Sequence, residues 1–320
     1  MNYFRPRRLR NNSIIRDMVR ENHLSKNDLI YPIFIEEGEN IKNEISSMPN
    51  IYRYSLDHAL EEINRAKNLG VKSFLLFGIP KHKDSHATGA YSDEGIIQKS
   101  LIEIKRQIKD VLIITDICNC EYTDHGHCGI VENGMVMNDP SVELLVKTAI
   151  SHVKAGADMV APSDMMDGRI QAIRKALDEN KFVDTPIMSY AVKYASAFYG
   201  PFREAADSAP KFGDRKSYQM DYSNSREALL EAEQDILENA DIIMVKPAMA
   251  YMDIISKVKE ICNLPISAYN VSGEYSMVKS AAAKGWIDER KIVLEILTGI
   301  KRAGADIIIT YHAPDVAEWL

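Results

Sequence analysis

Two stretches of this 320-residue chain are apolar runs that end on a lysine. Residues 241–246 end on Lys246, and the proline at position 247 prevents the run from continuing as a strand. Residues 185–193 have the same form and end on Lys193. An unpaired ammonium in an apolar interior is costly, so a buried strand rarely ends this way without a purpose. One such lysine could simply extend its charge to solvent, but two indicate a site for amine chemistry.

The chemistry expected of these lysines is nucleophilic attack on a ketone. If both ammonium groups lie in one pocket, they repel each other, and the pKa of at least one falls toward neutrality. An uncharged amine can then form a Schiff base with a carbonyl substrate. The alternative is that Lys193 and Lys246 form structural ion pairs with nearby aspartates.

A cysteine-rich stretch, residues 116–129, suggests a metal site. Three of the four cysteines fall here, at positions 118, 120 and 128, too close together for a secreted disulfide framework. Three thiolates from one loop suit zinc and leave a fourth position for water or substrate, as in Lewis-acid or hydroxide catalysis. The spacing differs from the paired C-x-x-C of zinc ribbons, so a structural finger is not expected. His125 and His127 are expected to support the ligands, and Cys262 to be a small buried apolar residue.

Eight apolar runs alternate with helical patterns, which predicts a parallel sheet. The runs are residues 29–35, 71–78, 111–118, 158–163, 185–193, 241–246, 264–272 and 305–311. Eight such units predict an α/β fold of the closed (β/α)₈, or TIM, barrel type. An open doubly wound sheet is the alternative, but the chain lacks the glycine fingerprint of a dinucleotide site. We expect one catalytic domain over residues 29–320 and a polar, basic N-terminal arm over residues 1–28.

The carboxyl ends of barrel strands carry the catalytic groups of such enzymes. Besides the two lysines, the expected strand ends hold Asp116, Cys118, Ser163, Asp164, Ser272 and Tyr311. The longest irregular segment, residues 194–223, is expected to be an active-site lid or a disordered loop. Its arginines, Arg203 and Arg215, could clamp a substrate carboxylate.

Composition excludes several classes of partner. Apolar residues make up 46% of the chain and charged residues 27%, which is typical of a soluble globular protein. The net charge of −7 argues against a nucleic-acid partner. No apolar run approaches the roughly 20 residues that a membrane span needs, and residues 1–20 lack the apolar centre of a signal peptide. We therefore expect a cytoplasmic protein with no nucleic-acid or membrane partner.

Taken together, these motifs resemble the porphobilinogen synthase family, also called δ-aminolevulinic acid dehydratase. The resemblance covers essentially the whole chain, and its most specific parts are residues 116–122, 126–129, 161–169, 193–202, 213–220 and 244–247. Residues 5–10 look like the family's N-terminal arm, which wraps a neighbouring subunit. A homo-octamer is the assembly that the resemblance implies. The chain keeps all three cysteines, so it resembles the zinc-dependent branch rather than members with aspartates there.

The implied reaction is condensation of two 5-aminolevulinate molecules into porphobilinogen, with loss of two waters, in tetrapyrrole (haem) biosynthesis. Lys246 would hold the ketone of the molecule that supplies the propionate side, and Lys193 would form the second Schiff base. Zinc would orient the second substrate and assist its activation, bound by Cys118, Cys120 and Cys128.

The resemblance also implies roles for further residues. Asp116 and Ser163 would assist proton transfer and positioning. The substrate contacts would come from Ser272 and Tyr311 for the first carboxylate, from Arg203 and Arg215 for the second, and from Gln219 and Phe198. Glu231 aligns with a carboxylate that binds an allosteric magnesium between subunits in part of the family.

Two other functions are alternatives to the porphobilinogen synthase reaction. Another Schiff-base barrel lyase, such as an aldolase, would normally need one such lysine and no three-cysteine loop. A non-catalytic zinc-binding scaffold would keep the fold without the chemistry, whereas every matched catalytic position is filled here. The prediction is therefore a hydro-lyase, a 5-aminolevulinate dehydratase.

Overall fold

The computed structural model describes residues 4–320, whose centre is a barrel of eight parallel strands. In chain order the strands are β1 (Leu29–Glu36), β4 (Ser73–Ile79), β5 (Leu112–Ile117), β8 (Met159–Pro162), β9 (Met188–Lys193), β10 (Ile242–Lys246), β11 (Ile266–Asn270) and β12 (Ile307–Thr310). They lie side by side in the order β8-β5-β4-β1-β12-β11-β10-β9. A parallel bridge between Val160 and Ile187 joins the two ends of this order, so the barrel is nearly closed. The predicted (β/α)₈ architecture is confirmed.

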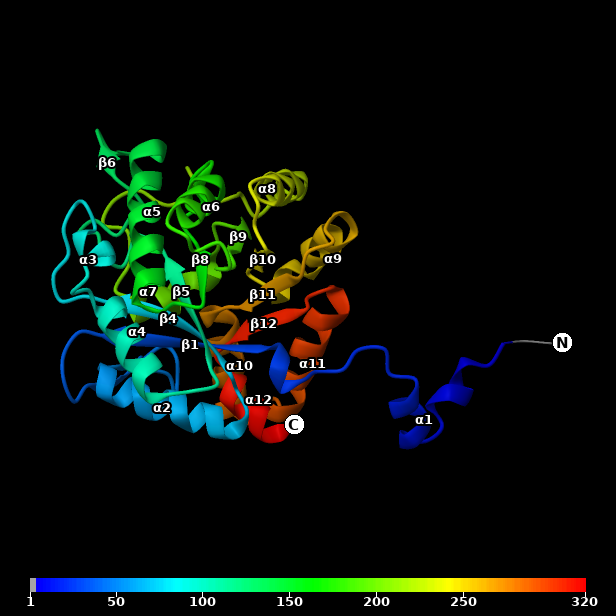
Figure 1. Ribbon diagram of the computed structural model, residues 1–320. Coiled ribbons are helices and arrows are strands. Elements are labelled where there is room, and N and C mark those ends of the chain that lie inside the picture. Colours follow the sequence, from blue (N-terminus) through cyan, green and yellow to red (C-terminus); the bar gives the residue numbers. More distant parts are fainter. Residues whose placement is uncertain (1–3) are drawn as a thin grey trace.

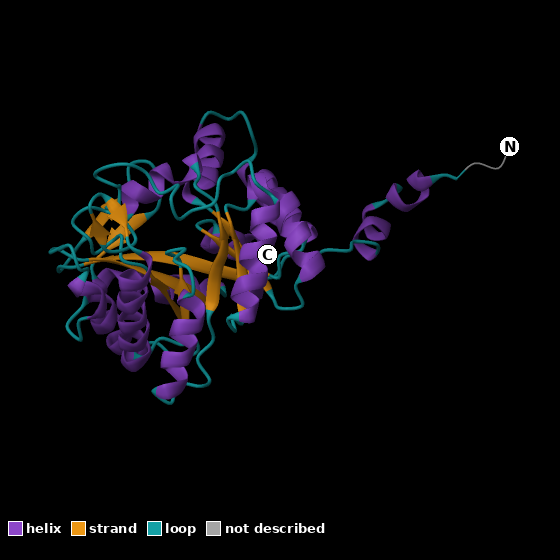
Figure 2. Ribbon diagram, turned by 90° about the horizontal axis from the view of Figure 1, so that it is seen from above, coloured by secondary structure: helices purple, strands orange, loops and turns teal. Residues whose placement is uncertain are grey.

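Helices surround the strands, as the views in Figures 1 and 2 show. The larger ones are α2 (Leu56–Leu69), α4 (Ile96–Gln107), α5 (Asn138–Ala155), α6 (Arg169–Glu179), α8 (Arg226–Leu237), α9 (Met252–Ile261), α10 (Ser272–Ala283) and α11 (Glu289–Ala303). Glycine ends two of them: Gly70 follows α2 and Gly156 follows α5, with φ of +106° and +114°. A positive φ of this kind costs glycine little, because it has no Cβ. The short α12 (Ala313–Trp319) follows the last strand.

Strand and helix interiors agree with the patterns in the sequence because each apolar run is buried. All five residues of β10 and all six of β9 are buried, including the terminal lysines. Strands covered by helices on the outside and packed against one another inside are expected to be apolar throughout. The eight runs therefore mark the wall of the barrel.

Several short elements are not evident in the sequence. A hairpin of β2 (Lys42–Glu44) and β3 (Tyr52–Tyr54) lies against β1. Others are the hairpin of β6 (Val131–Glu132) and β7 (Met135–Val136), and α3 (Thr88–Tyr91). Two to four residues are too few to show a helical or strand period.

The segment over residues 194–223 is more ordered than the sequence suggests. It begins with the 3-10 helix η3 (Ala197–Tyr199) and continues into α7 (Gly200–Ala205), with Pro201 in the first turn of that helix. Proline fits the first turn of a helix because the amide it lacks would have no partner there. The expectation of an irregular or disordered segment is therefore wrong for its first third.

The N-terminal residues extend away from the barrel (Figure 1). They form η1 (Pro6–Arg10), α1 (Ser13–Met18) and η2 (Lys26–Asp28), whereas the sequence pattern indicates no regular structure. No residue from 4 to 28 is buried. Within the described residues, no helix has both the length and the apolar character required to cross a membrane.

Candidate active site

The two lysines lie next to each other at the carboxyl ends of neighbouring strands. In the parallel pairing of β9 with β10, Lys193 is the partner of Lys246. Both are buried, with 4% and 5% of their surface exposed. Neither forms an ion pair within residues 4–320, which argues against the alternative of structural ion pairs. The structure therefore brings together the two residues from which the sequence predicts amine chemistry.

Lys246 lies among aromatic rings. Its Nζ is 4.5–5.2 Å from the ring centroids of Tyr190, Tyr199, Phe202 and Tyr269. Burial, followed by repulsion from Lys193, lowers the pKa of Lys246 to about 7. Ring faces attract an ammonium, but here they do not compensate for the loss of water. A large fraction of this amine is therefore uncharged, and nucleophilic, at neutral pH.

Lys193 is connected to a carboxyl group through Ser163. The Lys193 ammonium donates a hydrogen bond to the backbone carbonyl of Ser163. The Ser163 hydroxyl donates to Asp116 Oδ2 at 3.1 Å. Burial, and next the charge of Glu121, raises the pKa of Asp116 to about 8. Asp116 can therefore hold a proton near neutral pH, as proton transfer in the site requires.

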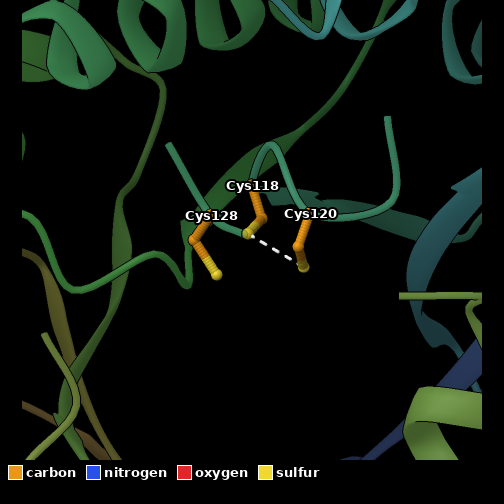
Figure 3. Close-up of side chains that lie close together, drawn as sticks. All are labelled: Cys118, Cys120 and Cys128. Carbon is orange, nitrogen blue, oxygen red and sulfur yellow. Dashed lines mark hydrogen bonds between the residues drawn. The ribbon is translucent and has the colours of Figure 1, made fainter. Parts of the chain in front are cut away.

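The three clustered cysteines meet in the loop after β5 (Figure 3). Their sulfur atoms are buried and lie within 4.8 Å of one another, with Cys118 Sγ 3.3 Å from Cys120 Sγ. Hydrogen bonding to these two holds the pKa of Cys128 well below its usual range. Three soft donors around one point fit zinc, whose preferred ligands include thiolates.

His127 supports this loop through both ring nitrogens. Nδ1 is 3.1 Å from the Tyr218 hydroxyl, and Nε2 is 3.0 Å from the carbonyl oxygen of Phe212. Both contacts are to the segment over residues 194–223, so His127 fastens that segment to the cysteine loop. Because both ring nitrogens already have partners, His127 is placed to support the cysteine loop.

Arg215 connects the segment over residues 194–223 to the cysteine loop. It is buried, and its Nη2 donates to the carbonyls of Gly126 at 3.0 Å and Ser208 at 2.5 Å. Burial, and then Arg215, lowers the pKa of Arg203. The Nε atoms of both arginines and both amide atoms of Gln219 are buried and have no hydrogen-bond partner among residues 4–320. Because buried polar groups are normally paired, these atoms are well suited to receive a polar ligand.

Ser272 and Tyr311 lie on the Lys246 side of the site. The Ser272 hydroxyl accepts a hydrogen bond from the Phe202 amide at 3.0 Å and donates to the Phe198 carbonyl at 3.3 Å. The Tyr311 hydroxyl is 3.0 Å from that of Tyr269, whose ring faces Lys246. Polar side chains therefore lie at two places in the site. Ser272 and Tyr311 lie near Lys246, and the segment over residues 194–223 carries the two arginines and Gln219.

Comparison with known proteins identifies the family. The family model described as Delta-aminolevulinic acid dehydratase matches residues 3–319. The chain belongs to this family. It is 59% identical over 320 residues to the Delta-aminolevulinic acid dehydratase of Synechocystis sp., covering 99% of this chain and 98% of the relative. The Bacillus subtilis protein of the same name is 57% identical over 316 residues, covering 99% and 98%.

A solved structure supports the same assignment. The δ-aminolevulinic acid dehydratase (porphobilinogen synthase) of Toxoplasma gondii ME49, in complex with the reaction product porphobilinogen, superposes with a TM-score of 0.98. It is 45% identical and covers 100% of this chain and 92% of its own. The family resemblance predicted from the sequence is confirmed, and so is the enzyme class.

Glu231 lies apart from the lysines. It is on α8, half-buried, beside a cavity of about 560 Å³ whose lining includes Gln219, Tyr218 and Glu227 but neither lysine. Burial raises the pKa of Glu231. His127 of the cysteine loop also lines this cavity, so Glu231 shares a cavity with that loop and not with the two lysines.

Two groups of residues near the site were not predicted from the sequence. The rings around Lys246 include Tyr190 and Tyr269, which sit inside apolar runs and resemble ordinary core residues. The other group is centred on the buried Arg169, whose Nη2 is 3.1 Å from Asp235 Oδ2 and whose Nε is 3.6 Å from Asp164 Oδ2. Arg169 closes the motif over residues 161–169, which is the signal that could have identified it.

Proposed function

We propose that this chain condenses two molecules of 5-aminolevulinate into porphobilinogen, with release of two waters, in porphyrin biosynthesis. The observation that carries the proposal is the pairing of Lys193 with Lys246, together with a pKa of about 7 for Lys246. Family membership supports the same reaction. An aldolase-type mechanism with a single Schiff base would leave the second buried lysine unexplained.

Lys246 is the nucleophile toward the first substrate molecule. Its uncharged amine forms a C–N bond to the ketone carbon, and the carbonyl oxygen leaves as water after protonation. The rings around it exclude solvent, which favours dehydration to the Schiff base over its hydrolysis. We propose that Ser272 and Tyr311 hold the carboxylate of this molecule through their hydroxyl groups.

Lys193 is the nucleophile toward the second molecule. An amine must be uncharged to attack a ketone, and we assign Asp116 and Ser163 to proton transfer and positioning there. The support is that both groups meet at Ser163, whose backbone carbonyl accepts a hydrogen bond from Lys193 and whose hydroxyl donates one to Asp116. Loss of the hydrogen bond to the Ser163 carbonyl would free the Lys193 amine to attack the ketone of the second substrate molecule.

The second carboxylate is assigned to the segment that covers the site. Arg203, Arg215 and Gln219 have buried polar atoms without partners, and the arginines offer donors with the geometry of a carboxylate. We propose that Phe198 contributes indirectly, since its carbonyl fixes the Ser272 hydroxyl. Carboxylate binding would thus order the segment over both substrates.

Cys118, Cys120 and Cys128 would hold zinc, because their three sulfurs converge and no disulfide links them. When bound, the ion supplies Lewis-acid activation of a substrate oxygen or of water. We propose the cytoplasm as the compartment, since free thiols at a metal site need reducing conditions.

A magnesium site and the assembly of subunits are proposed away from the two lysines. Glu231 has Asp167 and Glu227 near it, and carboxylate oxygens are the ligands that magnesium prefers. We propose magnesium binding there, completed by water or a neighbouring subunit. A homo-octamer is the proposed assembly, with the N-terminal arm on a neighbour, because the arm exposes Phe4, Ile14 and Met18 to solvent.

Two variants test the proposal. The full-length protein is incubated with 5-aminolevulinate, porphobilinogen is quantified, and the adduct trapped by borohydride is located by peptide mass. We expect Lys246→Met to lose the first adduct and Lys193→Met to keep it, with no porphobilinogen from either variant.

The alternatives give different results. A wild-type adduct without any pyrrole product would indicate another Schiff-base lyase, and a folded protein that forms no adduct would indicate a scaffold. Retention of the first adduct in Lys246→Met and its loss in Lys193→Met would reverse the order of the two lysines.

A further inference from the structure

A second charged cluster lies on the outer side of the site. The Lys279 ammonium, on α10, is 2.5 Å from Glu289 Oε1 on α11 and 3.1 Å from Asp315 Oδ2 on α12. Only 10% of the Lys279 side chain is exposed. One lysine thus connects three consecutive helices. The mechanism above does not use it.

This cluster stands one layer behind the proposed pocket for the first carboxylate. Ser272 opens α10, and Lys279 lies two turns further along the same helix. Tyr311 lies two residues before the first residue of α12, the helix that carries Asp315. The ion pair from Lys279 to Asp315 therefore joins the helix of one hydroxyl to the segment of the other.

The ring of Tyr275 fills the space between the cluster and the pocket. Its centroid is 5.8 Å from that of Tyr311, in an edge contact, and 4.4 Å from that of His312. Lys279 Nζ lies 5.4 Å from the centroid of the Tyr275 ring. The Tyr275 hydroxyl donates to the Pro49 carbonyl at 2.6 Å, so this ring is held at both ends. Movement of Lys279 would be transmitted to Tyr311 through packed groups.

The same cluster contains donors that could suit a metal. Oxygens of Glu289 and Asp315 and a ring nitrogen of His312 lie within 4.8 Å of one another. The Lys279 ammonium already provides the positive charge between the two carboxylates, so we do not assign an ion here. The cluster is better described as a clamp in which lysine is the central cation.

We propose that Lys279 is a positioning residue that sets the spacing of Ser272 and Tyr311, and so the selectivity of this pocket for a carboxylate-bearing ketone. The inference rests on the proposed function. Lys279 touches no substrate and acts through α10, Tyr275 and α12. Loss of its ammonium would leave Glu289 and Asp315 to repel each other and would move α12 away from α10.

The test compares two ligands in the full-length protein. One is 5-aminolevulinate and the other its methyl ester, which keeps the ketone and the amine but lacks the negative charge. The quantity measured is the ligand concentration that gives half-maximal borohydride trapping at Lys246. For Lys279→Met we expect a rise of roughly two- to thirtyfold for 5-aminolevulinate, the size of effect reported for residues that couple to a site without touching it. The value for the ester should stay unchanged.

Three further variants complete the design. Lys279→Arg retains the charge and should restore most of the preference for the free acid. Asp315→Asn removes the ion pair between Lys279 and α12, while the ion pair between Lys279 and Glu289 remains. This variant replaces Lys279→Met in the test if Lys279→Met does not fold. Lys291→Met is the matched control, because it removes a lysine of α11 whose ion pair with Asp288 is exposed.

The outcomes separate the two proposals. Two results would overturn the inference while leaving the proposed function intact. One is an equal rise in the half-maximal concentration for 5-aminolevulinate and for its ester. The other is no change in that concentration in Lys279→Met and Asp315→Asn. Absence of any adduct at Lys246 in the wild-type protein would overturn the proposed function, and this inference with it.

Discussion

At the scale of single residues, identical side chains acquire different chemistry from their neighbours. Lys193 and Lys246 are partners across two strands. Lys246 is surrounded by rings, whereas Lys193 donates a hydrogen bond to a backbone carbonyl. Removal of water favours the uncharged amine of Lys246. The site therefore contains two lysines with the same side chain and different surroundings, of which Lys246 is the nucleophile that is ready at neutral pH.

The lowered pKa of Lys246 predicts the pH dependence of the first Schiff base. Below about pH 7 the amine is mostly protonated, so the rate of adduct formation should fall about tenfold for each pH unit. Above that pH the rate should level off. The measurement is the initial rate of borohydride-trapped adduct at Lys246 between pH 5.5 and 9 in the wild-type protein, because Lys193→Met would remove the repulsion that contributes to the lowered pKa. A rate that rises steadily up to pH 9 would show that Lys246 has the pKa of an ordinary lysine.

At the scale of elements, the strands hold the lysines and the connecting segments bring the remaining groups. The cysteine loop follows β5, the covering segment follows β9, and α10 begins with Ser272. These connections also contact one another. Arg215 bonds to Gly126, and His127 to the carbonyl of Phe212. Changes in the connections should therefore alter the site while the barrel persists.

Removal of zinc should abolish porphobilinogen formation and leave the barrel folded. The three proposed ligands belong to one loop, whereas the main apolar contacts lie among the eight strands and their helices. The measurement combines activity with far-ultraviolet circular dichroism before and after chelation. Activity should return when zinc is added. Loss of helical signal in parallel with activity would mean that the ion is structural.

Gly273 provides a test of the contact between α10 and the covering segment. A Cβ at this position would lie 2.5 Å from the Phe198 carbonyl oxygen, whereas a Cβ on Gly200 would meet nothing within 4 Å. Overpacking typically costs about 1–3 kcal/mol. Gly273→Ala should therefore destabilise the protein by that amount and weaken activity, because Phe198 must move away from Ser272.

Urea unfolding measures this cost, with Gly200→Ala as the control. The control should be neutral or slightly stabilising, because alanine is favoured over glycine in a helix. Equal unfolding free energies for the two variants would contradict the proposed contact.

At the scale of the whole molecule, the barrel and the N-terminal residues differ in how they are stabilised. The barrel has a large continuous buried core. By contrast, Phe4, Ile14 and Met18 are 76–88% exposed, and nothing between residues 4 and 28 is buried. Apolar side chains in such a projection indicate contact with another surface.

Deletion of residues 1–12 should reduce assembly and leave the secondary structure of the barrel unchanged. The described part of this segment buries no side chain of its own, so its loss removes little from the core of the protomer. Sedimentation velocity at matched concentrations measures the assembly, and far-ultraviolet circular dichroism checks the fold. A truncated protein that sediments like the full-length chain would contradict the assigned role.

Much of the fold and part of the site follow from the sequence alone. Apolar runs identify the eight strands because barrel strands are buried on both sides, and a lysine at the end of such a run is conspicuous. The spacing of the cysteines predicts a zinc loop, because three thiols on one loop are close in the chain; the structure brings the three sulfur atoms together, and the ion stays a prediction. The motifs at Lys193 and Lys246 led to the family.

Other features depended on the tertiary structure. The register that pairs Lys193 with Lys246, and the rings of Tyr199, Phe202 and Tyr269 around the latter, join segments far apart in the chain. A pKa depends on which groups surround an amine in space, and sequence spacing does not give that information. The same holds for Lys279, whose partners lie on two other helices. The local pattern of apolar residues determined the strands and helices. The packing of segments far apart in the chain determined the surroundings, and so the chemistry, of the two lysines.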